Sequence, residues 1–185
     1  MVRAGVTVWL TGLSGAGKST IAEAAVARLR ALGVAATVLD GDVLRGGLNR
    51  DLGFTPEARA EAVRRAGEAA LLLSSSGVTA VAALISPYRA DRDRVRARHR
   101  EAGIPFLEVF VDAPVEVTAA RDPKGLYARA RAGEIPAFTG VSDPYEAPAA
   151  PELHLRTDGV SAESCVRSLV ERIVAAGSFP VSAAH

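Results

Sequence analysis

The chain has 185 residues, of which 49% are apolar and only 5% aromatic, and its formal net charge is +1. This length predicts one domain over residues 1–185 with a sizeable core, and the near-zero charge excludes a general attraction to nucleic acid or to membrane surfaces. The single cysteine, Cys165, excludes an internal disulfide and a cysteine-based zinc site, and is expected to serve in packing.

A glycine-rich loop lies between the first predicted strand and the first predicted helix. An apolar run over 6–10 predicts the strand, and an alanine- and leucine-rich segment over 21–32 predicts the helix. The loop has the spacing G-x-x-x-x-G-K-S, which is typical of a phosphate-binding loop. The residues expected to hold the phosphates of a nucleoside triphosphate are Gly12, Ser14, Gly15, Ala16, Gly17, Lys18, Ser19 and Thr20.

Each part of this loop has a physical role. Glycines let backbone N–H groups point inward, and the following helix N-terminus adds a partial positive charge. Lys18 is expected to reach the outer phosphates, and the Ser19 hydroxyl is expected to ligate Mg²⁺. The loop therefore indicates a phosphoryl donor and leaves the acceptor open.

Polar residues follow the second predicted strand, over 35–39. Ligands of an open parallel sheet bind beyond the carboxyl ends of its strands, so Asp42 and Arg45 are expected beside the phosphate-binding loop. Asp42 is a candidate to accept a proton from an attacking hydroxyl or to hold Mg²⁺, and Arg45 is a candidate to bind a phosphate or sulfate of the acceptor. A polar turn with a helix cap is the alternative, and Asp40, at the strand end itself, favours that role.

The next predicted helix, over 55–75, starts with a threonine cap and a first-turn proline. Arg59 on this helix is either a ligand contact or part of a solvated charged face. A nearly unbroken apolar run over 78–85 predicts a central strand that ends at Ser86. The helix after it, over 91–102, alternates aspartate and arginine and is expected to be exposed, with most of its charges solvated.

A proline- and glycine-punctuated segment over 121–151 is expected to be a mobile lid that closes over the ligands and excludes water. A disordered linker is the alternative, but it would leave the aromatic residues Tyr127, Phe138 and Tyr145 without a structural or binding role. The other elements of this half are expected to be strands over 106–112 and 152–155 and helices over 114–120, 126–132 and 161–175. The alternation predicts a three-layer α/β/α phosphate-loop nucleoside triphosphate hydrolase fold with a parallel sheet of about five strands.

Motifs along nearly the whole chain resemble adenylylsulfate kinase. They include Leu39-Asp40-Gly41-Asp42, Ile85-Ser86-Pro87-Tyr88-Arg89, Arg121-Asp122-Pro123-Lys124-Gly125, Phe138-Thr139-Gly140 and Pro144-Tyr145-Glu146-Ala147-Pro148. The resemblance implies phosphorylation of the ribose 3′-hydroxyl of adenosine 5′-phosphosulfate (adenylyl sulfate) by ATP. The product is then 3′-phosphoadenylylsulfate, formed by direct in-line transfer with Mg²⁺.

The resemblance also implies roles for individual residues. Asp42 matches the aspartate at the acceptor hydroxyl and magnesium, Lys124 a lid lysine near the transferred phosphoryl group, and Arg121 an arginine near the ATP base. Ser86 matches a serine described in the family as a phosphoserine intermediate. Direct in-line transfer needs no covalent enzyme intermediate, so we expect Ser86 to position the acceptor. The residues matched to acceptor binding are Asp42, Arg45, Phe54, Arg59, Ile85, Ser86, Lys124 and Phe138, with Phe54 and Phe138 stacking on the adenine.

Three differences from the family pattern, at Ala62, Val43 and Leu84, keep a second hypothesis open: a kinase of the same fold that acts on a different hydroxyl. A non-catalytic nucleotide-binding or regulatory protein is a third reading, which the intact Lys18, Ser19 and Asp42 disfavour. The resemblance further implies a homodimer with a possible functional link to ATP sulfurylase. We expect a cytoplasmic protein with no nucleic-acid or membrane partner, since neither a targeting segment nor an apolar run of about 18 residues is apparent.

Overall fold

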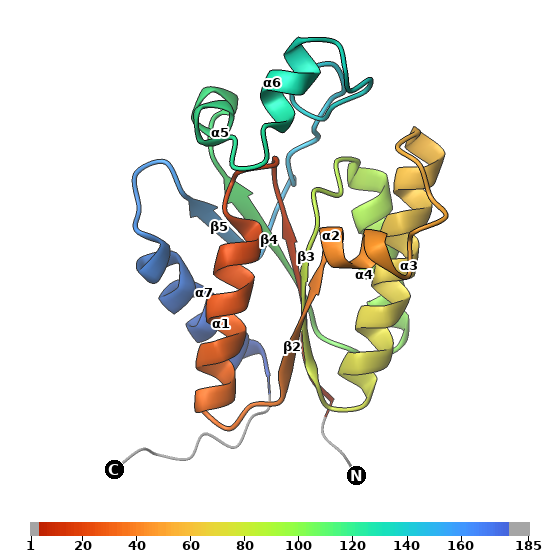
Figure 1. Ribbon diagram of the computed structural model, residues 1–185. Helices are drawn as coiled ribbons and strands as arrows, with labels where there is room; N and C mark the ends of the chain where they lie inside the picture. Colours follow the sequence, from red (N-terminus) through yellow and green to blue (C-terminus); the bar gives the residue numbers. More distant parts are fainter. Residues whose placement is uncertain (1–3, 178–185) are drawn as a thin grey trace.

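The computed structural model describes residues 4–177, which form a parallel five-stranded sheet with helices on both faces (Figure 1). The strand order is β2-β3-β1-β4-β5, and every neighbouring pair is parallel. The strands are β1 (Thr7–Thr11), β2 (Ala36–Asp40), β3 (Thr79–Ala83), β4 (Phe106–Asp112) and β5 (Leu153–Arg156). The predicted fold class is confirmed, and no strand begins or ends more than two residues from its predicted place.

Two helices cover each face of the sheet (Figure 1). Helices α1 (Lys18–Ala31) and α7 (Ala162–Ala176) cover one face, and α3 (Pro56–Ser75) and α4 (Arg89–Glu101) cover the other. Successive side chains of a strand point to opposite faces, so Val8 and Leu10 join the α1/α7 core while Trp9 joins the α3/α4 core. Cys165 is buried in the first of these cores, as predicted.

The α3/α4 layer depends on one close approach. Helix α3 begins where the Thr55 hydroxyl accepts a hydrogen bond from the backbone N–H of Ala58 at 3.2 Å, with Pro56 in the first turn. A Cβ added to Gly67 would lie 2.8 Å from a methyl group of Val95 on α4. Glycine therefore lets the two helices pack this closely.

The prediction of an exposed α4 is wrong for one face of that helix. Asp91, Arg92 and His99 are buried, because this face packs on α3 and on β4. Arg92 is buried because it forms an ion pair with Glu108 of β4, with 2.7 Å between Nε and Oε1. The charged residues on the other face of α4, such as Asp93 and Arg100, are exposed as expected.

The short helices α2 (Gly41–Gly46), α5 (Val115–Arg121) and α6 (Leu126–Arg131) lie toward the carboxyl edge of the sheet (Figure 1). The 121–151 segment has a small core of its own, made by Tyr127, Ala130 and Phe138. Tyr127 also donates a hydrogen bond to the carbonyl oxygen of Ser14 at 2.9 Å, so α6 is tied to the phosphate-binding loop. Among residues 4–177, no helix combines the length and the apolar character needed to cross a membrane.

Candidate active site

The phosphate-binding loop joins β1 to α1 and has a conformation that only glycine allows at its first position. Gly12 has φ 149°, and a Cβ there would lie 2.2 Å from the carbonyl oxygen of Val111 on β4. Gly17, with φ 102°, precedes the first residue of α1. The loop therefore ends on a helix N-terminus, the arrangement that binds phosphate anions.

Lys18 is buried inside this loop. Its Nζ donates hydrogen bonds to the carbonyl oxygens of Gly12 at 2.8 Å and Leu13 at 2.7 Å. Burial and, to a lesser extent, the positive charge of Lys124 together lower the pKa of Lys18 to about 7, against opposing effects of Asp42 and Asp40. The site therefore brings together the phosphate-loop lysine, the second predicted lysine and both aspartates.

Ser19 and Asp40 form the pair of oxygen donors next to this lysine. The Ser19 hydroxyl donates to Oδ2 of Asp40 at 2.6 Å, and Oδ1 of Asp40 accepts from the backbone N–H of Asp42 at 2.9 Å, which caps α2. Burial alone would raise the pKa of Asp40, but the hydrogen bonds from Ser19, Asp42 and Val43 outweigh it and lower the pKa below its usual value. Asp40 is therefore an ionised carboxylate beside a hydroxyl, a donor set that suits Mg²⁺.

Sequence reasoning undervalued Asp40 as a site residue. The capping role expected of Asp40 is correct, because its Oδ1 accepts the N–H of Asp42. Its Oδ2, however, accepts a hydrogen bond from Ser19, and the sequence predicted Asp42 as the metal ligand that acts with Ser19. The available signal was its position at the carboxyl end of β2. Asp42 instead forms an ion pair with Lys124 of the 121–151 segment, and both side chains are more than half exposed.

Arg45, Arg59 and Phe54 form a cluster on the α2/α3 side. The guanidinium carbon of Arg45 lies 4.2 Å from the ring centroid of Phe54, and that of Arg59 lies 6.0 Å from it. Burial lowers the pKa of Arg45, and the charge of Arg59 adds to this effect. Two guanidinium groups beside an exposed ring can bind an anion attached to a flat base.

Arg59 is buried and connects this cluster to the 121–151 segment. It donates to the carbonyl oxygens of Phe54 at 2.9 Å and Ala137 at 2.6 Å, and to the Thr139 hydroxyl at 2.9 Å. Phe54 is 58% exposed, whereas Phe138 is 7% exposed and packs edge-on against Tyr127 at 5.0 Å. The two predicted aromatic residues thus lie on segments that Arg59 joins, but their rings have different surroundings.

Ser86 is buried beyond the end of β3. Its hydroxyl accepts a hydrogen bond from Nε1 of Trp9 at 3.0 Å, and its φ of 40° is rare for a residue other than glycine. The carbonyl oxygen of Ile85, the partly buried residue before it, accepts from the Thr11 hydroxyl at 2.7 Å. The backbone of this turn is therefore fixed by side chains of β1.

Arg121 lies at the other side of the phosphate-binding loop. Its guanidinium donates to the carbonyl oxygens of Thr157 at 2.5 Å and Gly15 at 3.4 Å. The Thr157 hydroxyl donates in turn to the carbonyl oxygen of Ala16 at 2.9 Å. Sequence reasoning missed Thr157, for which position directly after β5 was the available signal.

The three differences from the family pattern have separate environments. Ala62 and Leu84 are buried, and Leu84 belongs to the α3/α4 core. Val43 is 74% exposed on α2. Two of the three therefore serve packing in this structure.

Comparisons with known proteins agree with the geometry. The family described as adenylylsulphate kinase matches residues 4–156. The adenylyl-sulfate kinase of Saccharomyces bayanus is 54% identical over 170 residues, which cover 92% of this chain and 84% of that protein. The adenylyl-sulfate kinase of Paraburkholderia xenovorans is 53% identical over 173 residues, covering 94% and 95%.

A solved structure is similarly close. The APS kinase of Mycobacterium tuberculosis, in complex with AMPPNP and APS, superimposes with a TM-score of 0.90 and is 46% identical, covering 92% of this chain and 98% of that one.

Proposed function

The chain belongs to the adenylylsulphate kinase family, and we propose how its residues divide the work of transferring the γ-phosphoryl group of ATP to adenylyl sulfate. The chain is an ATP-dependent kinase of adenylyl sulfate, which it phosphorylates at the ribose 3′-hydroxyl. The observation that supports the proposal best is that Lys18, Asp42 and Lys124 lie close together at the end of the phosphate-binding loop.

On the donor side, the loop binds the triphosphate. Backbone N–H groups and the α1 N-terminus hold the phosphates, and Lys18 leaves its carbonyl partners to bind the outer ones. Ser19, Asp40 and Asp42 are the residues that would hold Mg²⁺. The bound ion would neutralise charge that develops between the β- and γ-phosphates. Arg121 would lie beside the ATP base, near the Thr157 turn.

On the acceptor side, Asp42 receives the proton of the attacking hydroxyl. Its exposed carboxylate is available for this role once Lys124 turns toward the transferred phosphoryl group. Arg45 and Arg59 would bind the phosphosulfate, and Phe54 and Phe138 would stack on the adenine. In-line alignment then allows direct transfer.

The 121–151 segment acts as the lid of this site. Its contacts with the loop through Tyr127 and with α3 through Arg59 hold it over the carboxyl edge. Closure on both substrates would exclude water, which otherwise competes with the acceptor for the phosphoryl group.

Ser86 serves as a positioning residue for the acceptor and not as a covalent intermediate. Its hydroxyl is buried and accepts a hydrogen bond from Trp9, which supports a fixed structural role. Ile85 would contribute its backbone to the same wall of the acceptor site.

Assembly, location and metabolic context are proposals that rest on the family. We propose that the chain forms a homodimer in the cytoplasm, and that an ATP sulfurylase supplies its adenylyl sulfate. Light scattering of the purified chain tests the first point, and a monomer at working concentration would contradict it.

A coupled assay of ADP release tests the function. With ATP and Mg²⁺ present, micromolar adenylyl sulfate should start ADP release, and chromatography should detect 3′-phosphoadenylylsulfate in equal amount. Sugars and nucleosides with free hydroxyls should leave the rate at its background. A rate that ignores adenylyl sulfate but responds to another hydroxyl compound would identify a kinase with a different acceptor.

A further inference from the structure

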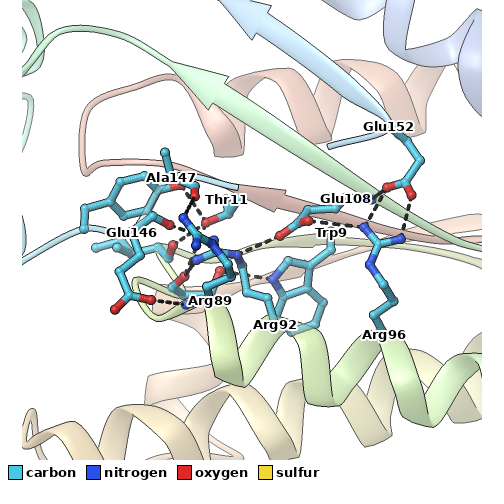
Figure 2. A network of polar contacts seen from close by, with 12 residues as sticks. Trp9, Thr11, Arg89, Arg92, Arg96, Glu108, Glu146, Ala147 and Glu152 are labelled. Carbon is cyan, nitrogen blue, oxygen red and sulfur yellow. Dashed lines mark hydrogen bonds and ion pairs between the residues drawn. The ribbon is translucent and has the colours of Figure 1, made fainter. Parts of the chain in front are cut away.

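Residues 143–147, near the end of the lid, are tied to the turn after β3, and we call them the return segment. The backbone N–H of Glu146 donates to the carbonyl oxygen of Pro87 at 2.9 Å, and Oε2 of Glu146 accepts from the backbone N–H of Arg89 at 2.7 Å. The hydroxyls of Tyr145 and Thr11 lie 2.9 Å apart. The return segment therefore lies against residues 86–89 (Figure 2).

Arg92 is the buried residue that joins these two pieces of chain. It is 1% exposed, and each of its three guanidinium nitrogens donates a hydrogen bond of 2.7 Å. Nε bonds to Glu108, and one terminal nitrogen bonds to the carbonyl oxygen of Glu146 (Figure 2). The other terminal nitrogen bonds to the carbonyl oxygen of Ser86. Because a guanidinium is planar and rigid, it fixes the two carbonyls relative to each other.

The carbonyl on one side of Arg92 belongs to the residue with the unusual backbone. Ser86 has φ 40°, a conformation that persists only when its surroundings over-determine it. Its surroundings do so through Arg92 at the carbonyl and Trp9 at the hydroxyl. Arg92 thus holds the turn that carries Ile85 and Ser86.

The carbonyl on the other side belongs to the end of the lid. Arg59 holds the part of the lid just before the return segment, because it donates hydrogen bonds to Ala137 and Thr139. Residues 137–146 are therefore fixed at both ends by buried arginines, with Phe138 between them. Arg59 is proposed to touch the acceptor directly, whereas Arg92 is enclosed on all sides.

We propose that Arg92 is a positioning residue for the acceptor: it holds the Ser86 turn and the return segment together as one wall of the adenylyl sulfate site. This inference rests on the proposed function. Arg92 itself touches no substrate, and its effect reaches the acceptor through Ser86 and through residues 137–146.

The same charge network offers a matched control. Arg96 bonds to Oε2 of Glu108 at 3.2 Å and to Glu152 at 2.6 and 2.8 Å (Figure 2). It makes no hydrogen bond with Ser86 or Glu146. Replacing Arg96 therefore disturbs the ion pairs of the network. The carbonyl oxygens of Ser86 and Glu146 keep their hydrogen bonds to Arg92.

The experiment compares Arg92→Lys with Arg96→Lys. Lysine keeps the charge next to Glu108 but cannot span all three acceptors. We expect Arg92→Lys to raise the KM for adenylyl sulfate about tenfold or more, because the variant loses one or two hydrogen bonds that position the acceptor site. The KM for ATP should stay within about twofold. Hydrogen exchange at the amide of Glu146 should become faster. Arg96→Lys should change neither.

A double variant guards against failure to fold. Should Arg92→Lys not fold, Arg92→Gln with Glu108→Gln removes both charges at once, so that no buried ion is left without a partner. The same shift in acceptor KM is expected of it. An unchanged acceptor KM, an equal loss for ATP and acceptor, or the same effect in Arg96→Lys would overturn the proposal.

A failure of the proposed function can be distinguished from a failure of the proposal for Arg92. If the wild-type chain showed no turnover dependent on adenylyl sulfate, the function would be wrong. Hydrogen exchange at Glu146 would still decide whether Arg92 holds the return segment.

Discussion

Asp42 and Lys124 form an ion pair between α2 and the lid, so the carboxylate proposed to serve the acceptor and the lysine proposed to serve the phosphoryl group bind each other. Both charges act on the buried Lys18, which shows that all three groups lie in one site. The pair neutralises two charges that must separate for transfer in the proposed mechanism. The pair therefore couples the position of the lid to the availability of the proposed general base, Asp42.

Replacing Lys124 by Met should reduce activity without reducing stability. The side chains are 52% and 67% exposed, so the pair contributes less than about 1 kcal/mol to the free energy of unfolding. Loss of a positive charge at the transferred group should lower kcat about 100-fold or more. Urea unfolding and steady-state kinetics measure the two effects. Arg129→Met, which breaks the similarly exposed lid pair with Glu134, should change neither. An unchanged kcat for Lys124→Met would remove Lys124 from catalysis.

The Asp42→Asn variant should bind ATP and fail to transfer its phosphoryl group. Removing a general base lowers kcat by about 10² to 10⁴, while the triphosphate keeps its contacts with the loop and Lys18. Stopped-time product analysis gives kcat, and calorimetry gives the Kd for ATP. Glu171→Gln on α7, an exposed carboxylate on the opposite layer, is the control. Retained turnover in Asp42→Asn would exclude the role assigned to Asp42.

Phe54→Ala is a cleaner test of adenine stacking than Phe138→Ala. Phe54 is exposed, so its truncation should leave the melting temperature unchanged. The variant should lose the stacking energy of one base, about 1 to 3 kcal/mol, and its KM for adenylyl sulfate should therefore rise at least fivefold. Phe138→Ala also removes packing against Tyr127, so it should lower the stability of the lid as well. Equal increases in KM for both substrates would contradict the stacking role of Phe54.

The lowered pKa of Lys18 predicts that ATP binding takes up a proton. The folded chain without ligand has a pKa of about 7 at Lys18, against 10.5 for the ordinary lysine, and the triphosphate charge should raise it again. Binding at pH about 8 should therefore take up close to one proton. Calorimetry in two buffers of different ionisation enthalpy measures this uptake, and heats independent of the buffer would contradict it.

The same shift has a defined sign for stability. Between pH 7 and 10.5 the unfolded chain binds more protons at Lys18 than the folded chain does, so this group makes folding more favourable as the pH rises through that range. Below pH about 7 both states are protonated, and the cost of burying the charge is present in full.

Sequence patterns predicted the strands, the main helices and the phosphate-binding loop because these depend on local periodicity, caps and glycine positions. The partner of a side chain is a different matter. Arg92 stands in an aspartate/arginine run typical of an exposed helix, and its burial depends on Glu108, 16 residues later on another element. Phe138 was predicted as a ligand contact, but whether its ring faces a ligand or Tyr127 depends on how the lid folds on itself.

The central claim is that the phosphoryl group passes from ATP to the acceptor hydroxyl in one step inside this site. The stereochemical course tests it most directly, with ATP made chiral at the γ-phosphorus by oxygen isotopes and the configuration of the 3′-phosphate read in the product. A single in-line transfer predicts inversion at phosphorus. Retention would mean two transfers through an enzyme-bound phosphoryl group, with Ser86 as the first residue to examine, and would contradict the account.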